Sequence, residues 1–155
     1  MLTGAACERS FVVRTAWLYG YIGKNFVKTM LRLARENGKI SVVNDQLGNP
    51  TNANDLAYEI LKIAATDNYG TYHCTNNGTC SWFDFACAVV DAAGIECEKE
   101  GLSSAEYKER FPQSADRPAY SSLENAHLAA TIGDEMRPWQ DALATYMDKF
   151  EELAD

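Results

Sequence analysis

The sequence predicts an α/β fold in which short strands alternate with helices. Apolar runs rich in β-branched and aromatic residues occur at 11–17, 40–45 and 70–75, and each is followed by apolar residues at helical spacing. A chain of 155 residues is long enough for one compact domain with a core. The 46% hydrophobic and 23% charged residues are typical of a globular protein and argue against disorder.

The first predicted strand covers residues 11–17. Polar residues are absent from it until Arg14, so we expect a strand that is covered on both faces. A helix is predicted from Asn25, because apolar residues then recur at helical spacing (Phe26, Met30, Leu33 and Ala34). Gly38 stands where a left-handed C-terminal cap would end this helix.

The second strand, residues 40–45, runs into the turn-rich stretch "QLGNPT", where Pro50 excludes continued central pairing. A second helix is predicted to begin between residues 51 and 54, with an apolar stripe formed by Leu56, Ile60, Ile63 and Ala64. The third strand, residues 70–75, follows the helix-breaking Asn68 and Gly70.

A third helix is predicted to begin at Ser81, which caps it while Asp84 lies in its first turn, and to end at Gly94. Residues 95–120 are polar and contain two prolines, so we expect irregular structure there apart from a short helix over 104–110. A last helix takes Pro138 as its first residue, and one of its faces is apolar (Trp139, Ala142, Leu143, Tyr146 and Phe150).

Charge and residue patterns exclude several classes of partner. The net charge is −8 and the basic residues are scattered, so no nucleic-acid partner is expected. No apolar run reaches the roughly 20 residues that span a bilayer, and the first residues do not resemble a signal peptide, so we expect a cytoplasmic protein without membrane contact. The odd number of cysteines, five, predicts reduced thiols, and two isolated histidines with dispersed cysteines predict no metal site.

No glycine-rich phosphate loop of the G-x-G-x-x-G or G-x-x-x-x-G-K type occurs in the sequence. The chain therefore carries no recognisable nucleotide cradle of its own.

Six ordered sequence blocks carry a family resemblance. They read "RTAWLYG", "NFVKTMLRLA", "SVVNDQLGNPT", "GTYHCTNNGTCSWFDFA", "DRPAYSSLEN" and "WQDAL". In this order they closely resemble the C-terminal half of dTDP-4-dehydrorhamnose reductases, members of the extended short-chain dehydrogenase/reductase superfamily. The resemblance covers residues 11–146.

The resemblance implies a fold and an activity. The family reduces a 4-keto nucleotide sugar with NADPH or NADH in dTDP-rhamnose biosynthesis for polysaccharides, using a Rossmann domain that bears a smaller, mostly C-terminal substrate domain. We expect residues 1–10 to form an N-terminal tail, native or appended, and residues 11–155 to form the substrate-binding domain. In the family the cofactor fingerprint and the catalytic tyrosine and lysine lie upstream of "RTAWLYG". We therefore expect this chain to be inactive alone and to bind no cofactor.

A second interpretation from another functional class stays open. The same fold serves as the regulatory subunit of methionine adenosyltransferase, so a non-catalytic binding module is the alternative. In either case a dTDP-sugar nucleotide is the ligand that the resemblance to the reductases implies. If the strand at 11–17 normally has a further neighbour, its free edge would favour self-association.

The resemblance also implies ligand contacts at the first block. Trp17 matches the aromatic residue that packs on the sugar, while Tyr19 is as consistent with core packing as with ligand contact. Thr15 and Ala16 lie where the family's strand passes beneath the nicotinamide. Asn25 matches a residue that hydrogen-bonds the diphosphate, and it is also a candidate helix cap.

Later blocks imply the remaining contacts. Four residues of the "DQ-x-G-x-PT" block match a loop over the nucleotide, although a rigid turn explains them equally well (Gln46, Gly48, Pro50 and Thr51). Arg117 matches an arginine that often clamps the diphosphate, with a surface ion pair as the alternative. Asn54 replaces an acidic residue that joins a metal-bridged dimer contact in some members, which lowers any expectation of magnesium.

Overall fold

A computed structural model of the chain describes residues 6–153, with side chains described as far as Phe150. Along the chain its strands are β1 (Phe11–Arg14), β2 (Leu18–Tyr19), β3 (Lys39–Val43), β4 (Leu47–Gly48), β5 (Thr51–Asn52), β6 (Gly70–His73), β7 (Cys80–Ser81) and β8 (Glu98–Leu102). Its helices are α2 (Phe26–Asn37), α3 (Ala53–Ala64), α4 (Trp82–Ala92), α5 (Ser104–Arg110), α6 (Ala126–Thr131) and α7 (Trp139–Leu153). This alternation confirms the predicted α/β class.

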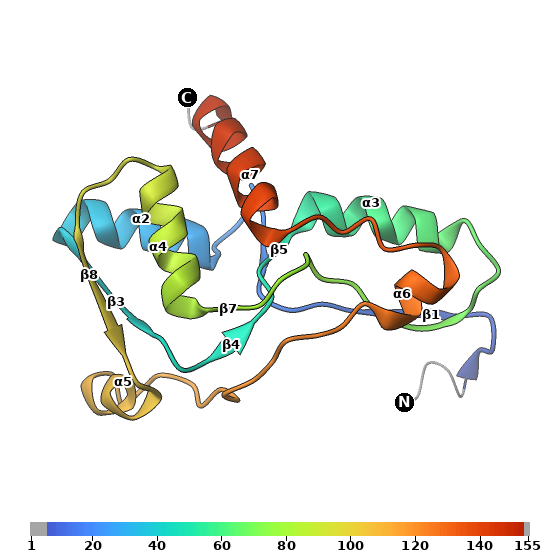
Figure 1. Cartoon of the computed structure of the whole chain (residues 1–155), viewed down its shortest axis with the longest axis horizontal. Coiled ribbons are helices and arrows are strands. Elements are labelled where there is room, and N and C mark those ends of the chain that lie inside the picture. Colours follow the sequence, from blue (N-terminus) through green and yellow to red (C-terminus); the bar gives the residue numbers. More distant parts are fainter. Residues whose placement is uncertain (1–5, 154–155) are drawn as a thin grey trace.

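The elements form two lobes that lie side by side in Figure 1. The first, here the α2–α4 lobe, contains α2, β3, α4, β8 and α5. The second, the β1–β6 lobe, contains β1, α3, β6 and α6. Helix α7 rises between them, and the short strands β2, β4, β5 and β7 connect them.

Each lobe is organised around one parallel strand pair. In the α2–α4 lobe β3 pairs with β8, from Lys39 opposite Glu98 to Val43 opposite Leu102. In the β1–β6 lobe β1 pairs with β6, from Phe11 opposite Gly70 to Arg14 opposite His73. Parallel partners require a crossover connection, and α2 and α3 belong to these crossovers.

The main core fills the space between α2, α4, β3 and α7. Its buried residues include Val27 and Leu31 of α2, Phe85 and Val89 of α4, and Tyr146 of α7. A smaller cluster lies under α3 and α6 and is formed by Leu56, Ile63, Tyr72, Cys74, Leu128 and Met136. The apolar stripes predicted for α2, α4 and α7 therefore face one shared core.

Helix ends follow the predicted capping chemistry. The Asn25 side chain accepts a hydrogen bond from the Lys28 amide, and Gly38 ends α2 in the left-handed region at φ 62°. Ser81 and Asp84 form a capping box on α4. Helix α5 spans the predicted residues. The Pro138 carbonyl accepts from the Ala142 amide, so Pro138 caps α7 instead of being its first residue.

Two predictions about strands were wrong. The strand predicted over 11–17 ends at Arg14, because Trp17 adopts a left-handed backbone conformation at φ 45°, and β1 is half-buried instead of covered. Residues 98–102, expected to be irregular, form β8. Its alternating acidic residues face water, where Glu98 pairs with Lys39 and Glu100 with Arg110.

The N-terminal tail predicted for residues 1–10 lies in part outside the described residues. Within the described part, the Ser10 carbonyl accepts a hydrogen bond from the Gly70 amide, so the tail is tied to β6 directly before β1 begins. The described part of the chain contains no helix long and apolar enough to cross a membrane.

Candidate ligand-binding site

The candidate site begins where the chain passes from one lobe to the other. β1 ends at Arg14, and the chain joins β5 through β2, where Leu18 is opposite Thr51. The carbonyl of Trp17 accepts a 3.2 Å hydrogen bond from the Thr51 amide. The left-handed conformation at Trp17 costs of order 1 kcal/mol for a residue other than glycine. The surrounding contacts therefore hold this residue in place.

The indole of Trp17 has neighbours on several sides. It stacks on the indole of Trp82, with ring centroids 3.6 Å apart and planes within 9°. The backbone of Gly48 packs against the same ring, because a Cβ atom at Gly48 would overlap the Trp17 atoms Cε2, Cζ2 and Nε1. The indole nitrogen donates to the Ser121 hydroxyl at 3.2 Å. Trp17 as a whole is half-buried, so part of it remains for a ligand.

Trp82 also borders a cavity of about 430 Å³ in the α2–α4 lobe. The cavity lies between α2, β3, α5 and the segment that follows α5. Its wall is mostly apolar and aromatic, with a few polar groups, and comprises Phe26, Thr29, Met30, Ser41, Val42, Val43, Gln46, Trp82, Tyr107, Ser114, Ala115 and Arg117. A cavity of this size with few polar groups is typical of a small-molecule site.

The polar groups of this cavity lie on different elements. Arg117 belongs to the exposed segment after α5. Gln46 is 8% exposed, and its side-chain amide donates to the Ser104 hydroxyl at 2.9 Å. The Gln46 carbonyl accepts from the Trp82 amide at 3.3 Å, which ties this residue to the start of α4. The structure thus brings Gln46 and Arg117 to one cavity.

Asn25 is occupied by helix capping. Its carbonyl oxygen accepts from the Lys28 amide at 3.1 Å, and its amide group donates to the Gly20 carbonyl at 2.7 Å. Asn25 therefore has the capping role that was the alternative to diphosphate binding. It also directly precedes Phe26, which lines the cavity.

Leu47 is exposed, but the loop is buried from Gly48 to Thr51. Pro50 is buried and Thr51 is fully buried, with its hydroxyl 3.4 Å from the Asn49 carbonyl. Gly48 is the exception with a direct link to the site, because it contacts Trp17. These positions favour the rigid-turn interpretation for Pro50 and Thr51.

Tyr19 lies in the core. Only 1% of it is exposed, and its ring packs edge-on against Tyr146 at 5.1 Å. Its hydroxyl has no hydrogen-bond partner among the described residues, and burial, followed by the charge of Asp55, raises its pKa. Of the two interpretations of Tyr19, the structure favours core packing.

Thr15 and Ala16 form the turn between β1 and β2. Both are half-buried, and the Thr15 hydroxyl oxygen is buried without a hydrogen-bond partner among the described residues. An unpaired buried hydroxyl is costly, and this one is enclosed by the protein.

Three residues of the site escaped the sequence analysis. Trp82 and Ser121 lie in the blocks "GTYHCTNNGTCSWFDFA" and "DRPAYSSLEN", but neither was assigned a role at the site. Tyr107 of α5 was not singled out. No group of three or more His, Cys, Asp or Glu side chains that could hold a metal occurs among residues 6–153, and Asn54 is exposed.

The alternating strands and helices define an α/β fold with a mostly apolar and aromatic cavity in its α2–α4 lobe. The chain belongs to the family described as the RmlD substrate binding domain, which matches residues 1–152. The spore coat polysaccharide biosynthesis protein SpsK of Bacillus subtilis is 38% identical over 146 residues, covering 94% of this chain and 50% of that protein.

The solved structures to which this chain is similar include dTDP-4-dehydrorhamnose reductases. A dTDP-4-dehydrorhamnose reductase from Clostridium acetobutylicum has a TM-score of 0.84 at 45% identity, covering 91% of this chain and 49% of that one. The Bacillus anthracis enzyme, in complex with NADP, has a TM-score of 0.81 at 41% identity, covering 91% of this chain and 48% of that one. The chain thus spans about half the length of these relatives, and they favour the reductase interpretation over the regulatory module.

Proposed function

We propose that this chain is the substrate-binding part of an NADPH- or NADH-dependent dTDP-4-dehydrorhamnose reductase and that it binds a dTDP-sugar nucleotide. The observation that carries the proposal is the cavity of about 430 Å³ that joins the Trp17–Trp82 pair to Arg117. The family match and the reductase relatives support it.

The cavity offers chemistry for each part of such a ligand. The guanidinium of Arg117 presents a planar set of donors that suits a diphosphate. The apolar and aromatic wall, with Phe26 and Tyr107, suits the flat nucleobase. Trp17 lies beyond Trp82 at the strand end, where the sugar would be placed. Tyr19 and Thr51 are buried, so they support the site through core packing and do not contact the ligand.

Thr15 and Ala16 fit one edge of a nicotinamide cofactor. Both are small and half-buried, so the backbone at this strand end can approach a flat ring closely. The cofactor supplies the hydride when it is bound. The described residues provide only this edge, and the sequence has no glycine-rich phosphate loop. We therefore infer that the chain alone binds substrate without turning it over.

Calorimetric titration with dTDP-rhamnose tests substrate binding. Replacing Arg117 by alanine removes a charge-assisted contact, so the affinity should fall by about tenfold to a hundredfold. Arg35→Ala is the matched control, because Arg35 is exposed on the opposite flank of α2 and should leave the affinity unchanged. An absence of saturable heat at millimolar ligand would contradict the proposal.

Incubation with NADPH and the 4-keto sugar nucleotide tests whether the chain alone lacks reductase activity. We expect no oxidation of NADPH by the chain alone. Measurable turnover would show that the described residues suffice for catalysis.

The free edge of β1 is a further part of this proposal. Among the described residues β1 pairs with β6 alone, so its other edge can accept a strand from another polypeptide or a second copy. Sedimentation at high concentration should show association, and a Val12→Lys variant should reduce it. A strictly monomeric profile would argue against this edge as a contact.

A further inference from the structure

Trp82 is the residue most closely engaged with the Trp17 side chain. It is the first residue of α4, its amide donates to the Gln46 carbonyl at 3.3 Å, and the capping box at Ser81 fixes the helix start behind it. Its ring also packs against the ring of Phe26, with centroids 4.5 Å apart. Since α4 is packed in the main core, Trp82 is mounted on a rigid element.

Trp17, by contrast, lies on a connection without regular structure. Its ring is held by three contacts that come from three separate segments: Trp82 in α4, Gly48 in β4 and Ser121 after α5. None of these contacts involves the backbone next to Trp17. The orientation of the indole is therefore set from outside its own strand.

We propose that Trp82 is a positioning residue that, with Gly48 and Ser121, clamps the Trp17 indole in one orientation for contact with the sugar. This inference rests on the proposed function. The stacked face is covered by Trp82, Gly48 packs against the same ring, and the nitrogen is paired with Ser121.

The clamp is tested first without ligand. The protein contains three tryptophans. Trp139→Phe combined with a substitution of Trp82 therefore leaves Trp17 as the sole indole. Quenching of its fluorescence by acrylamide then measures how accessible the Trp17 ring is to solvent. With Trp82→Phe a flat ring remains, and quenching should stay low. With Trp82→Leu, which is apolar but not flat, quenching should rise by about twofold or more. Equal quenching in the two variants would overturn the clamp.

A second variant tests the hydrogen bond. Ser121→Ala in the Trp82→Phe, Trp139→Phe background keeps the ring contact but removes the acceptor of the indole N–H. Trp17 should become more accessible to acrylamide, while the thermal midpoint changes little because Ser121 is only half-buried. Unchanged quenching would remove Ser121 from the clamp. Thermal melts of all variants establish that they are folded when quenching is measured.

Ligand addition separates this inference from the proposed function. dTDP is titrated by calorimetry and its effect on Trp17 quenching is followed in the Trp82→Phe, Trp139→Phe protein. Heat of binding with unchanged or lower quenching supports both proposals. Heat with a large increase in quenching shows that Trp17 leaves the clamp, which overturns this inference alone. Without heat the proposed function fails, and the ligand-free comparison still decides the clamp.

Discussion

The two lobes differ in how completely they bury their own strands. In the α2–α4 lobe, Ile40, Val42 and Val43 of β3 are 1%, 5% and 7% exposed. In the β1–β6 lobe, the corresponding apolar residues of β1 (Phe11, Val12 and Val13) are only half-buried. The apolar residues of β3 are covered by the helices of their own lobe, whereas those of β1 keep exposed apolar surface, although both ladders have only two strands.

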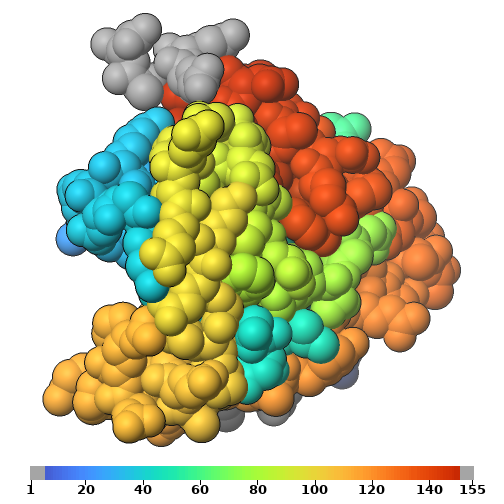
Figure 2. Space-filling model, turned by 60° about the vertical axis from the view of Figure 1, so that its left-hand side comes forward, coloured from blue at the N-terminus to red at the C-terminus, as the bar shows by residue number. Residues whose placement is uncertain are grey.

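The helices show the same contrast. The apolar residues of α2 face the main core, and Val27 is fully buried. On α3, Tyr58 and Leu61 are 61% and 71% exposed. In Figure 2 the α4 and β8 segments, in green and yellow, pack closely beside α2. The candidate cavity therefore belongs to the lobe whose apolar side chains are the better buried. The β1–β6 lobe keeps apolar surface against which another element can pack.

The largest expected effect on the free energy of unfolding comes from truncating one buried side chain in each of the two core clusters. Phe85→Ala, in the fully buried centre of the main core, should lower the free energy of unfolding by about 3–5 kcal/mol. Leu128→Ala, fully buried in the smaller cluster, should cost about 2–3 kcal/mol because its thinner surroundings can collapse more easily. Chemical denaturation measures both. Leu61→Ala is the exposed control and should stay within about 0.5 kcal/mol.

If Leu128→Ala proved more damaging than Phe85→Ala, the smaller cluster would be the more rigidly packed one. The contrast between the lobes would then be wrong.

The next effect concerns the junction between α3 and α7. Arg137 binds both oxygens of Asp55 at 2.9 Å, and their side chains are 35% and 18% exposed. Asp55→Asn leaves the guanidinium without its charge partner. We expect a loss of about 1–3 kcal/mol, below the value for a fully buried pair because Arg137 is partly in water. Thermal unfolding measures this loss.

Glu36→Gln is a matched control for that variant, since it breaks the exposed Arg32–Glu36 pair within α2 and should cost much less. Equal losses in the two variants would show that the Asp55–Arg137 pair does not stabilise the junction between α3 and α7.

Two buried thiols report local opening in each cluster. Burial raises the pKa of both Cys74 and Cys80 to about 12, so the intrinsic reactivities of the two thiols are similar. Cys74 lies in the smaller cluster and Cys80 in the main core. We expect Cys74 to be alkylated about tenfold faster, with exposed Cys7 as the reference. Peptide mass spectrometry gives the rates, and faster labelling of Cys80 would reverse the order of stability.

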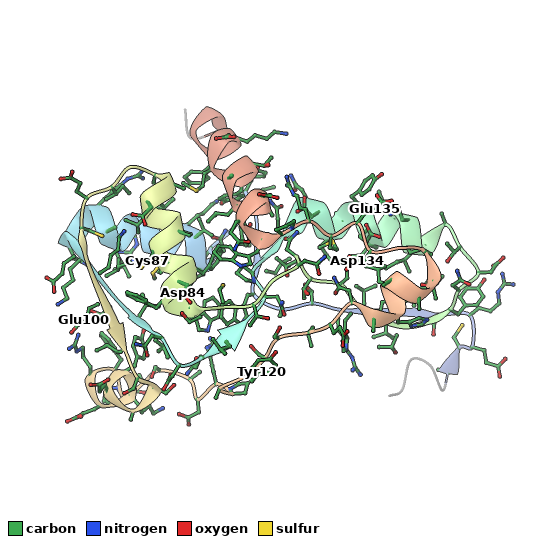
Figure 3. All side chains as sticks on the ribbon, viewed as in Figure 1. Asp84, Cys87, Glu100, Tyr120, Asp134 and Glu135 are labelled. Atoms are coloured by element: carbon green, nitrogen blue, oxygen red, sulfur yellow. The ribbon has the colours of Figure 1, made fainter. Side chains whose placement is uncertain are left out.

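The smallest effect is a pH dependence confined to the α2–α4 lobe. Hydrogen bonds from Arg110, then Ser41 and Lys39, lower the pKa of Glu100 from 4.5 to about 2. Figure 3 shows Glu100 on β8, at the outer side of that lobe. Because the folded pKa is depressed, the stabilisation is complete above about pH 4.5 and is lost as the pH falls towards 2. Glu100→Gln should flatten the decline of the thermal midpoint over that interval. An unchanged slope would remove Glu100 from the acid response.

Local chemistry made the helices of this fold predictable. Asn25, Gly38 and the Ser81–Asp84 box act within a few residues of themselves, so their roles can be recognised in the sequence. β8 could not be recognised, because its pairing with β3 depends on a distant strand and its charges imitate a solvated loop. The candidate cavity was only partly predictable for the same reason. Gln46 and Arg117 were marked by the resemblance, whereas the contacts of Trp82, Gly48 and Ser121 with Trp17 arise from three segments that meet only in the folded chain.

The two parallel ladders also have a kinetic consequence. Lys39 and Glu98 are 59 residues apart, and so are Phe11 and Gly70, so both ladders close loops of the same length. The entropy of loop closure depends mainly on length and does not favour either ladder. The order of folding is then decided by the apolar surface that each ladder buries as it forms. We expect β3–β8 to form first and β1–β6 to follow, so that the connection carrying Trp17 docks onto a cavity that is already assembled.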